Sequence, residues 1–198
     1  MKPINNYDNI KEAGGDIQNL PAGGYICIIK KCSEKDNKSG NGTHLEVLFD
    51  VNEGEWAGFF EDDYRAQYRD DKFWHGIINQ NIPNENSPKY NTQCGFFKRF
   101  TNAIEDSNPG YRWDWNEAGL KDKKIGVIFR EYEKKSLLGN RYMTTRAETV
   151  VSVDAIRSEK YRVPAPKMLD AAPVNGGVLL PTNTPVPTYQ EDETDMPF

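Results

Sequence analysis

Hydrophobic and polar residues alternate along two stretches near the start of the chain, as in β-strands with one buried face. Residues 25–32 (YICIIKKC) are rich in β-branched and aromatic side chains, and residues 45–51 (LEVLFDV) carry apolar side chains at every second position. Between them, the Asn41-Gly42 pair is typical of a tight turn whose central residues have positive φ. We therefore expect residues 25–51 to form a β-hairpin.

The next region is less regular and includes one predicted helix. Residues 59–74 suggest a short strand that begins at Phe59-Phe60, followed by an irregular aromatic and charged segment, and residues 81–88 (NIPNENSP) have the composition of a loop. After the loop, apolar residues recur at helical spacing, with Thr92 as the expected N-cap and Asn108-Pro109-Gly110 as the stop. The apolar stripe of this helix is formed by Phe96, Phe97, Phe100, Ala103 and Ile104.

Two further strands follow in the second half of the chain. Residues 123–135 (KKIGVIFREYEKK) alternate so that Phe129 lies on one face, and Arg130 and Tyr132 share the opposite one. A turn at Leu138-Gly139-Asn140 leads into residues 141–153 (RYMTTRAETVVSV), a fifth strand, and a short capped segment closes the body.

The predicted order is therefore β-β-β-α-β-β, with the helix between strands three and four. This order resembles the OB-fold, a five-stranded Greek-key barrel that binds oligonucleotides along strands two and three and the loops that join strands one–two and four–five. We expect a mainly β protein in which residues 1–163 form one OB-fold domain.

The composition changes abruptly at Pro164. Residues 164–198 hold seven of the 12 prolines and have no apolar periodicity. A segment of this kind cannot bury enough apolar surface to offset the entropy lost on ordering. We expect residues 164–198 to be a flexible, disordered linker that presents its last residues to a partner.

The charge distribution alters the first impression that the composition gives. A net charge of −5 by itself disfavours a nucleic-acid partner. Residues 164–198, however, hold one lysine and five acids, a net charge of −4, which leaves −1 for residues 1–163. The body is near neutral, and its cations can gather on one face.

Basic and aromatic side chains are interleaved in three stretches that an OB-fold would bring to its binding face. A single strand of DNA is held by cations along its backbone and by rings on which bases stack. The candidates are Lys35 and Lys38 between strands one and two; Tyr64, Arg65, Tyr68, Arg69 and Trp74 after strand three; and Arg130, Tyr132, Lys134, Arg141, Tyr142 and Arg146 on strands four and five. Each of these residues also fits an ordinary solvated strand face or a core position. The aromatic cluster at residues 111–115 (YRWDW) is expected to cover one end of the barrel.

The sequence gives little support to catalysis or metal binding. Glu61-Asp62-Asp63 with Asp70-Asp71 is a conceivable Mg²⁺ site of a nuclease, but adjacent carboxylates on a strand point to alternate faces, which favours a solvated charge run. Cys27 and Cys32 are five positions apart and so are expected on opposite faces of their strand. We expect no metal, no cofactor and no catalytic residue.

We also expect no targeting signal or membrane span. No apolar run approaches the ~20 residues of a membrane-spanning helix, and the polar start MKPINNYDN does not read as a signal peptide. With three cysteines and no paired spacing, the expected location is the cytoplasm, away from membranes.

The last residues of the chain carry a specific resemblance. QEDETDMPF (190–198) resembles the C-terminal tip of bacterial single-stranded DNA-binding proteins, in which an acidic run precedes a small hydrophobic residue, proline and a terminal phenylalanine. Here Met196 replaces the usual isoleucine, and Thr194 interrupts the acids. The resemblance implies that Phe198 enters a hydrophobic pocket with a basic rim on a replication, recombination or repair protein. The implied partner-binding residues are Asp192, Glu193, Asp195, Met196, Pro197 and Phe198.

These observations predict a non-enzymatic, sequence-tolerant single-stranded DNA-binding protein, whose body resembles OB-fold proteins of phages and mobile elements. One alternative is an OB-type protein-interaction module of a phage or mobile element that does not bind DNA, and a less favoured one is a metal-dependent nuclease. The sequence leaves open the preference for DNA or RNA, the site size, and whether the chain forms a homo-oligomer.

Overall fold

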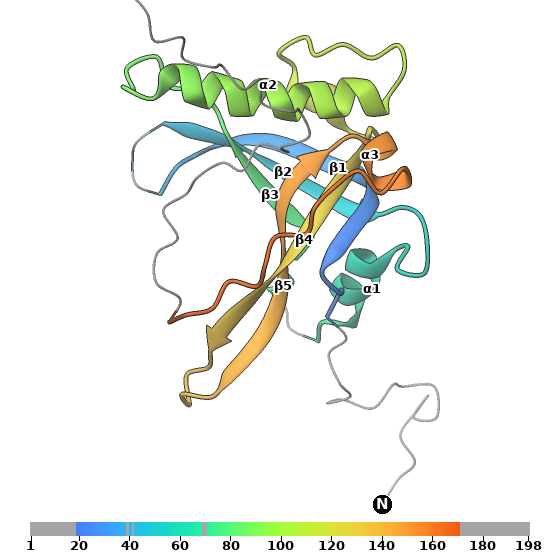
Figure 1. Cartoon of the computed structure of the whole chain (residues 1–198), viewed down its shortest axis with the longest axis vertical. Coiled ribbons are helices and arrows are strands. Elements are labelled where there is room, and N and C mark those ends of the chain that lie inside the picture. Colours follow the sequence, from blue (N-terminus) through green and yellow to red (C-terminus); the bar gives the residue numbers. More distant parts are fainter. Residues whose placement is uncertain (1–18, 39, 41, 69–70, 171–198) are drawn as a thin grey trace, which may run out of the picture.

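The computed structural model describes residues 19–38, 40, 42–68 and 71–170 (Figure 1). The expectations for Asn41, Arg69, Asp70 and the tip residues lie outside the described residues. Five strands form one antiparallel sheet, β1 (Gly23–Asp36), β2 (Thr43–Val51), β3 (Ile77–Asn81), β4 (Lys124–Lys135) and β5 (Arg141–Val151), in the order β3-β2-β1-β4-β5. The predicted mainly β class and four of the five predicted strands are confirmed.

The predicted third strand was misplaced. Residues 59–66 form helix α1 (Phe59–Ala66) instead of a strand, and the third strand is β3, at residues 77–81. The carboxylate of Asp50 explains this helix, because it accepts hydrogen bonds from the backbone N–H groups of Phe60 (2.9 Å) and Glu61 (3.3 Å) in the first turn. Burial raises the pKa of this carboxyl, and the backbone donors partly offset the shift.

A close approach of the backbone decides where β3 begins. A Cβ atom on Gly76 would lie 2.3 Å from the carbonyl oxygen of Phe49 on β2 and 2.7 Å from the ring of Phe60 on α1. Glycine therefore allows the chain to pass between β2 and α1 before it pairs with β2.

The predicted long helix is present as α2 (Tyr90–Ser107), which begins two residues before the expected N-cap Thr92. It ends at the predicted stop, where the side chain of Asn108 binds two elements: its Nδ2 donates to the carbonyl of Lys124 (2.8 Å), and its Oδ1 accepts from the N–H of Lys124 (2.9 Å). This pair of hydrogen bonds joins the end of α2 to the first residue of β4.

The core lies inside the curl of the sheet and is closed by α2 (Figure 1). Two shorter helices, η2 (Glu117–Leu120) and α3 (Val153–Arg157), pack on β1 and β4. The two edge strands, β3 and β5, approach one another and line opposite sides of one pocket. Among the described residues, the longest helices are not apolar enough to cross a membrane.

A β-bulge in β1 corrects the expectation for the two cysteines. The register of β1 against β2 shifts between Ile29 and Lys31, so that one additional residue is accommodated. Cys27 and Cys32 therefore both point into the core, instead of lying on opposite faces. Burial raises the pKa of the Cys32 thiol to about 12, which keeps it protonated and unreactive.

The first residues of the expected linker lie along the sheet. The end of β4 extends past its pairing with β1, and there Lys167 forms a parallel bridge with Tyr132. The N–H of Lys167 donates to the carbonyl of Glu131 (2.9 Å), and its own carbonyl accepts from the N–H of Glu133 (2.9 Å). The segment 164–170 is thus fixed to β4 by a single bridge at Lys167, and residues 171–198 lie outside the described residues.

Candidate nucleic-acid interface

The ends of β4 and β5 extend beyond the core as an arm, defined here as residues 130–146 (Figure 1). Residues directly opposite each other on antiparallel strands point to the same face. The cross-strand pairs Arg130–Arg146, Tyr132–Thr144 and Lys134–Tyr142 therefore share one face of the arm. Five predicted site residues (Arg130, Tyr132, Lys134, Tyr142 and Arg146) lie on this surface, which we call the cationic face.

The ring of Tyr132 is the centre of the cationic face. Three cations lie near its centroid: Arg130 at 5.7 Å, Arg146 at 5.8 Å and Lys167 at 5.6 Å. Each is within the range of a cation–π interaction. Lys167 was not predicted as a site residue because its segment was assigned to the linker, and only the bridge to β4 brings it here.

The carboxylate of Glu148 links two side chains of the cationic face. Glu148 accepts a hydrogen bond from Arg130 (3.2 Å) and another from the hydroxyl of Tyr132. Burial raises the pKa of Tyr132, and the hydrogen bond to Glu148 adds to the shift. Burial lowers the pKa of Lys134, and the nearby charge of Arg146 lowers it further. Among the described cations, Arg130 alone is paired with this acid, whereas Lys134, Arg146 and Lys167 lie on the same face or at the Tyr132 ring, so positive charge predominates here.

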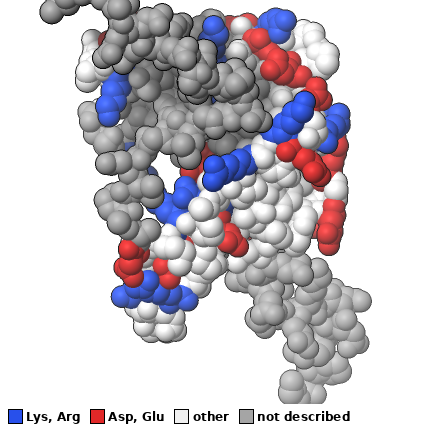
Figure 2. Space-filling view, viewed as in Figure 1, with Lys and Arg blue, Asp and Glu red and all other residues white. Residues whose placement is uncertain are grey.

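Arg141 was predicted to belong to this surface but lies on the opposite face of the arm. Its guanidinium is 3.4 Å from the carboxylate of Glu133 and 2.5 Å from that of Asp170. Figure 2 shows basic and acidic atoms side by side at the lower tip of the arm, in agreement with these ion pairs. The two carboxylates neutralise the charge that Arg141 would offer to a phosphate.

The second predicted cluster is gathered around α1 in the region of residues 59–75, which we call the α1 region. Tyr64 contacts Trp74 (5.7 Å between ring centroids), and the indole N–H of Trp74 donates to the carbonyl of Phe49 (3.0 Å). Arg65 forms an ion pair with Glu61 one turn earlier. Tyr68 is 78% exposed. Most of this cluster therefore makes structural contacts.

The first predicted cluster is small and partly neutralised. Lys35 lies within β1, not in the loop, and its ammonium is 2.6 Å from the carboxylate of Glu46 on β2. Lys38 is exposed in the turn between the two strands. In Figure 1 this turn and the arm lie on the left of the view and α1 lies on the right, so the α1 region is apart from the other two clusters.

The acidic run at residues 61–63 lies on helix α1. The expectation that these carboxylates point to alternate faces of a strand, which was used against a nuclease site, is therefore wrong. Asp63 contacts His75 (2.6 Å from Oδ2 to Nδ1), and Glu61 pairs with Lys30 as well as with Arg65. Among the residues that the structure describes, no three His, Cys, Asp or Glu side chains are grouped to hold a metal ion.

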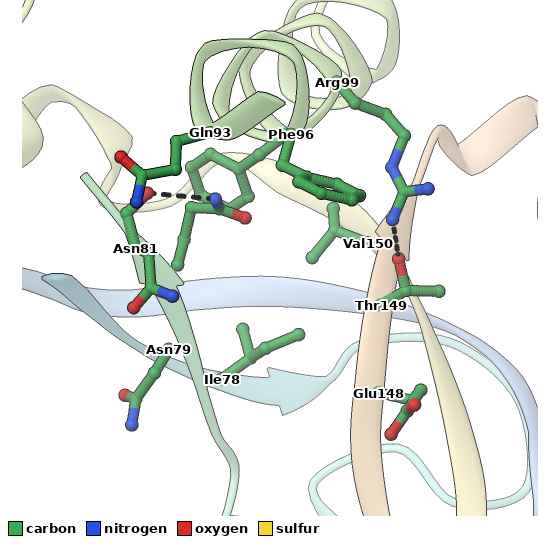
Figure 3. A pocket seen from close by; sticks show the side chains of 11 residues that line it. Ile78, Asn79, Asn81, Gln93, Phe96, Arg99, Glu148, Thr149 and Val150 are labelled. Atoms are coloured by element: carbon green, nitrogen blue, oxygen red, sulfur yellow. Dashed lines mark hydrogen bonds between the residues drawn. The ribbon is translucent and has the colours of Figure 1, made fainter. Parts of the chain in front are cut away.

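A polar pocket was not predicted from the sequence. It lies between β3, α2 and β5, where Gln80, Gln93, Phe96, Arg99 and Thr149 line a volume of about 290 Å³ (Figure 3). We call it the seam pocket. The helical stripe placed Phe96 in the core, but its ring is 46% exposed and lines this pocket. The adjacent Phe97 takes the buried position.

The aromatic cluster after α2 is divided between two roles. Tyr111 and Trp113 pack against the core, as expected for side chains that cover the end of the sheet. Trp115 is 78% exposed and stacks on Phe97, with the ring centroids 6.1 Å apart.

No model of a known protein family matches the chain, and no curated protein sequence matches it.

Proposed function

We propose that this chain is a sequence-tolerant single-stranded DNA-binding protein of the OB-fold type, acting in replication, recombination or repair in the cytoplasm. The antiparallel order β3-β2-β1-β4-β5, the approach of β3 to β5 and the position of α2 between β3 and β4 support the OB-fold assignment. The C-terminal tip, by its resemblance, recruits partner proteins of the same processes.

The cationic face is the observation that carries this proposal. Arg130, Arg146 and Lys167 lie around the ring of Tyr132, Lys134 shares the same face, and Tyr142 on this face is 48% exposed. Such a surface attracts the phosphate backbone, and an exposed ring accepts a stacked base of any identity. Tyr132 itself is enclosed by cations, so its role is to position them, and Tyr142 is the better stacking platform.

The test is a fluorescence titration of labelled oligo-dT with the full chain over a series of salt concentrations. We expect binding in the micromolar range or tighter, with an affinity that falls steeply as salt is added. Absence of binding at low salt would contradict the proposal. A chain that lacks residues 196–198 should retain its DNA affinity and lose its partner proteins, which tests the role assigned to the tip.

One observation favours the alternative of a protein-interaction module. Leu137 and Leu138, at the tip of the arm, are both fully exposed, which is unusual for two adjacent leucines. If the arm binds a protein instead of DNA, Leu137→Ser with Leu138→Ser abolishes that complex, and the wild-type chain fails to bind oligo-dT at any salt concentration.

A further inference from the structure

The seam pocket occupies the space where the sheet is not closed by hydrogen bonds. Among the described residues, β3 pairs with β2 and β5 pairs with β4, so the facing edges of β3 and β5 present backbone donors and acceptors to the space between them. Helix α2 covers this space and contributes Gln93, Phe96 and Arg99 (Figure 3). The volume of about 290 Å³ is at the lower limit for small-molecule sites. It suits one flat ring system better than a larger ligand.

The lining combines one ring face with several hydrogen-bonding side chains. Phe96 offers a partly exposed ring, and the guanidinium of Arg99, 5.8 Å from that ring, donates to the hydroxyl of Thr149 (2.6 Å). The amide of Gln93 is already held by hydrogen bonds to the loop before α2, whereas the amide of Gln80 donates to the carbonyl of the next residue (3.2 Å) and has further capacity to donate and accept. An aromatic ring beside a neutral amide matches a planar ligand with donors and acceptors along its edge, and a nucleobase has this chemistry.

The seam pocket is continuous with the cationic face through β5. Glu148 lines the pocket and also accepts the hydrogen bonds of Arg130 and Tyr132, and the next residue, Thr149, binds Arg99. A strand whose phosphates follow the cationic face therefore reaches the mouth of the pocket at Glu148. Its bases are unpaired, so one of them can turn out of the stack at low cost.

We propose that the seam pocket binds one unstacked nucleobase of the bound single strand, with Phe96 stacking on the base and the amide of Gln80 contacting its edge. This inference rests on the proposed function, because it assigns a further contact to the same strand of DNA. It predicts that the path of the DNA continues from the arm to α2, instead of ending on the arm.

The experiment uses the full chain and an oligo-dT of the minimal length that binds, with single thymines replaced in turn by 5-iodouracil. Irradiation should crosslink one position of the oligonucleotide to a peptide of β3, α2 or β5 that lines the pocket, as identified by mass spectrometry. A chain with Phe96→Ala should lose this crosslink and bind the oligonucleotide roughly tenfold more weakly, the usual effect of removing one stacked base. An abasic residue at the crosslinking position should weaken the wild type by a similar factor and have little further effect on Phe96→Ala.

The matched control is Trp115→Ala, which removes another exposed aromatic side chain near the same helix but outside the pocket. It should leave both the crosslink and the affinity unchanged. Gln80→Ala serves as a second pocket variant, and the far-ultraviolet circular dichroism of each variant should equal that of the wild type.

The outcomes separate this inference from the proposed function. If the wild type does not bind oligo-dT at low salt, the proposed function is wrong and the inference is lost with it. If the wild type binds, but Phe96→Ala and Gln80→Ala bind equally well and the crosslinks map to the arm alone, only the pocket assignment is overturned. Pocket peptides crosslinked to a second copy of the chain, or protected by a protein partner, would overturn it as well.

Discussion

The arm and the α1 region are made of the same residue types but present different surfaces. Both interleave tyrosines with arginines and lysines, and the sequence predicted a DNA-binding role for each. In the α1 region, Arg65 is paired with Glu61, and Trp74 is hydrogen-bonded to β2. On the arm, cross-strand pairing places Arg130 and Arg146 on one face, and the bridge of segment 164–170 adds Lys167.

The difference shows that local composition does not decide where positive charge accumulates. On a helix, residues four positions apart are neighbours, so acids one turn away neutralise the cations of α1. On adjacent strands, alternation places Arg130, Lys134 and Arg146 on one face of the arm. The two acids of the arm, Glu131 and Glu133, lie on the other face, where Arg141 is paired.

The largest effect is expected from removing charge on the cationic face. A chain with Lys134→Ala, Arg146→Ala and Lys167→Ala should bind oligo-dT roughly hundredfold more weakly. The slope of the logarithm of the binding constant against the logarithm of the salt concentration should also become shallower by about 2, since each of the three lost phosphate contacts contributes about 0.7. The matched variant in the α1 region, Arg65→Ala with Lys72→Ala, should stay within about twofold of the wild type. Equal losses from both variants would contradict the contrast.

Substitutions in the α1 region should reduce the stability of the fold. Asp50→Ala removes the acceptor of three backbone N–H groups, of Val51 (2.8 Å), Phe60 (2.9 Å) and Glu61 (3.3 Å). We expect the free energy of unfolding, measured in urea, to fall by about 2 kcal/mol, the usual cost of leaving buried donors without a partner. Asp62→Ala, which alters an exposed acid on the same helix, should cost less than half as much. A smaller loss for Asp50→Ala than for Asp62→Ala would show that α1 is held by other contacts.

Exposed tyrosines from the two regions provide a third comparison. Tyr142 is 48% exposed on the cationic face, and Tyr68 is 78% exposed in the α1 region. Tyr142→Ala should reduce the affinity for oligo-dT roughly tenfold, because one base loses its stacking partner. Tyr68→Ala should have no measurable effect, although Tyr68 is the more exposed ring. The reverse result in the same titration would move the binding surface to α1.

The smallest effect concerns pH. Burial and the charge of Arg146 lower the pKa of Lys134 in the free protein, and a bound phosphate would raise it again. DNA binding should therefore take up protons at alkaline pH, and the affinity should decrease as the pH is raised from 7 towards 9.5. Lys134→Arg keeps the charge over this range, so its affinity should decrease less. Parallel curves for the two proteins would indicate that Lys134 does not contact the DNA.

Periodic patterns in the sequence predicted much of the fold and part of the candidate site. Alternation over residues 123–135 located β4 and placed Arg130 and Tyr132 on one face, because the period of a strand is fixed by the backbone. Asn108 was identified as the end of the long helix, and the structure adds that its side chain joins this helix to β4. The tip at residues 190–198 was found by its resemblance alone, and the role assigned to it stays a prediction.

Features that depend on contacts between distant residues required the tertiary structure. The hydrogen bond that Asp50 accepts from the N–H of Phe60, which favours α1 over a strand, joins residues ten positions apart, and the bulge of β1 that turns Cys32 inward is defined only against β2. Lys167 reaches Tyr132 across 35 positions of sequence, and the seam pocket exists because the sheet curls until β3 approaches β5. A sequence pattern records the period of one element, so it determined which residues face the same way within each strand. Which elements meet, and therefore which charges and rings share a surface, was decided by packing around one core.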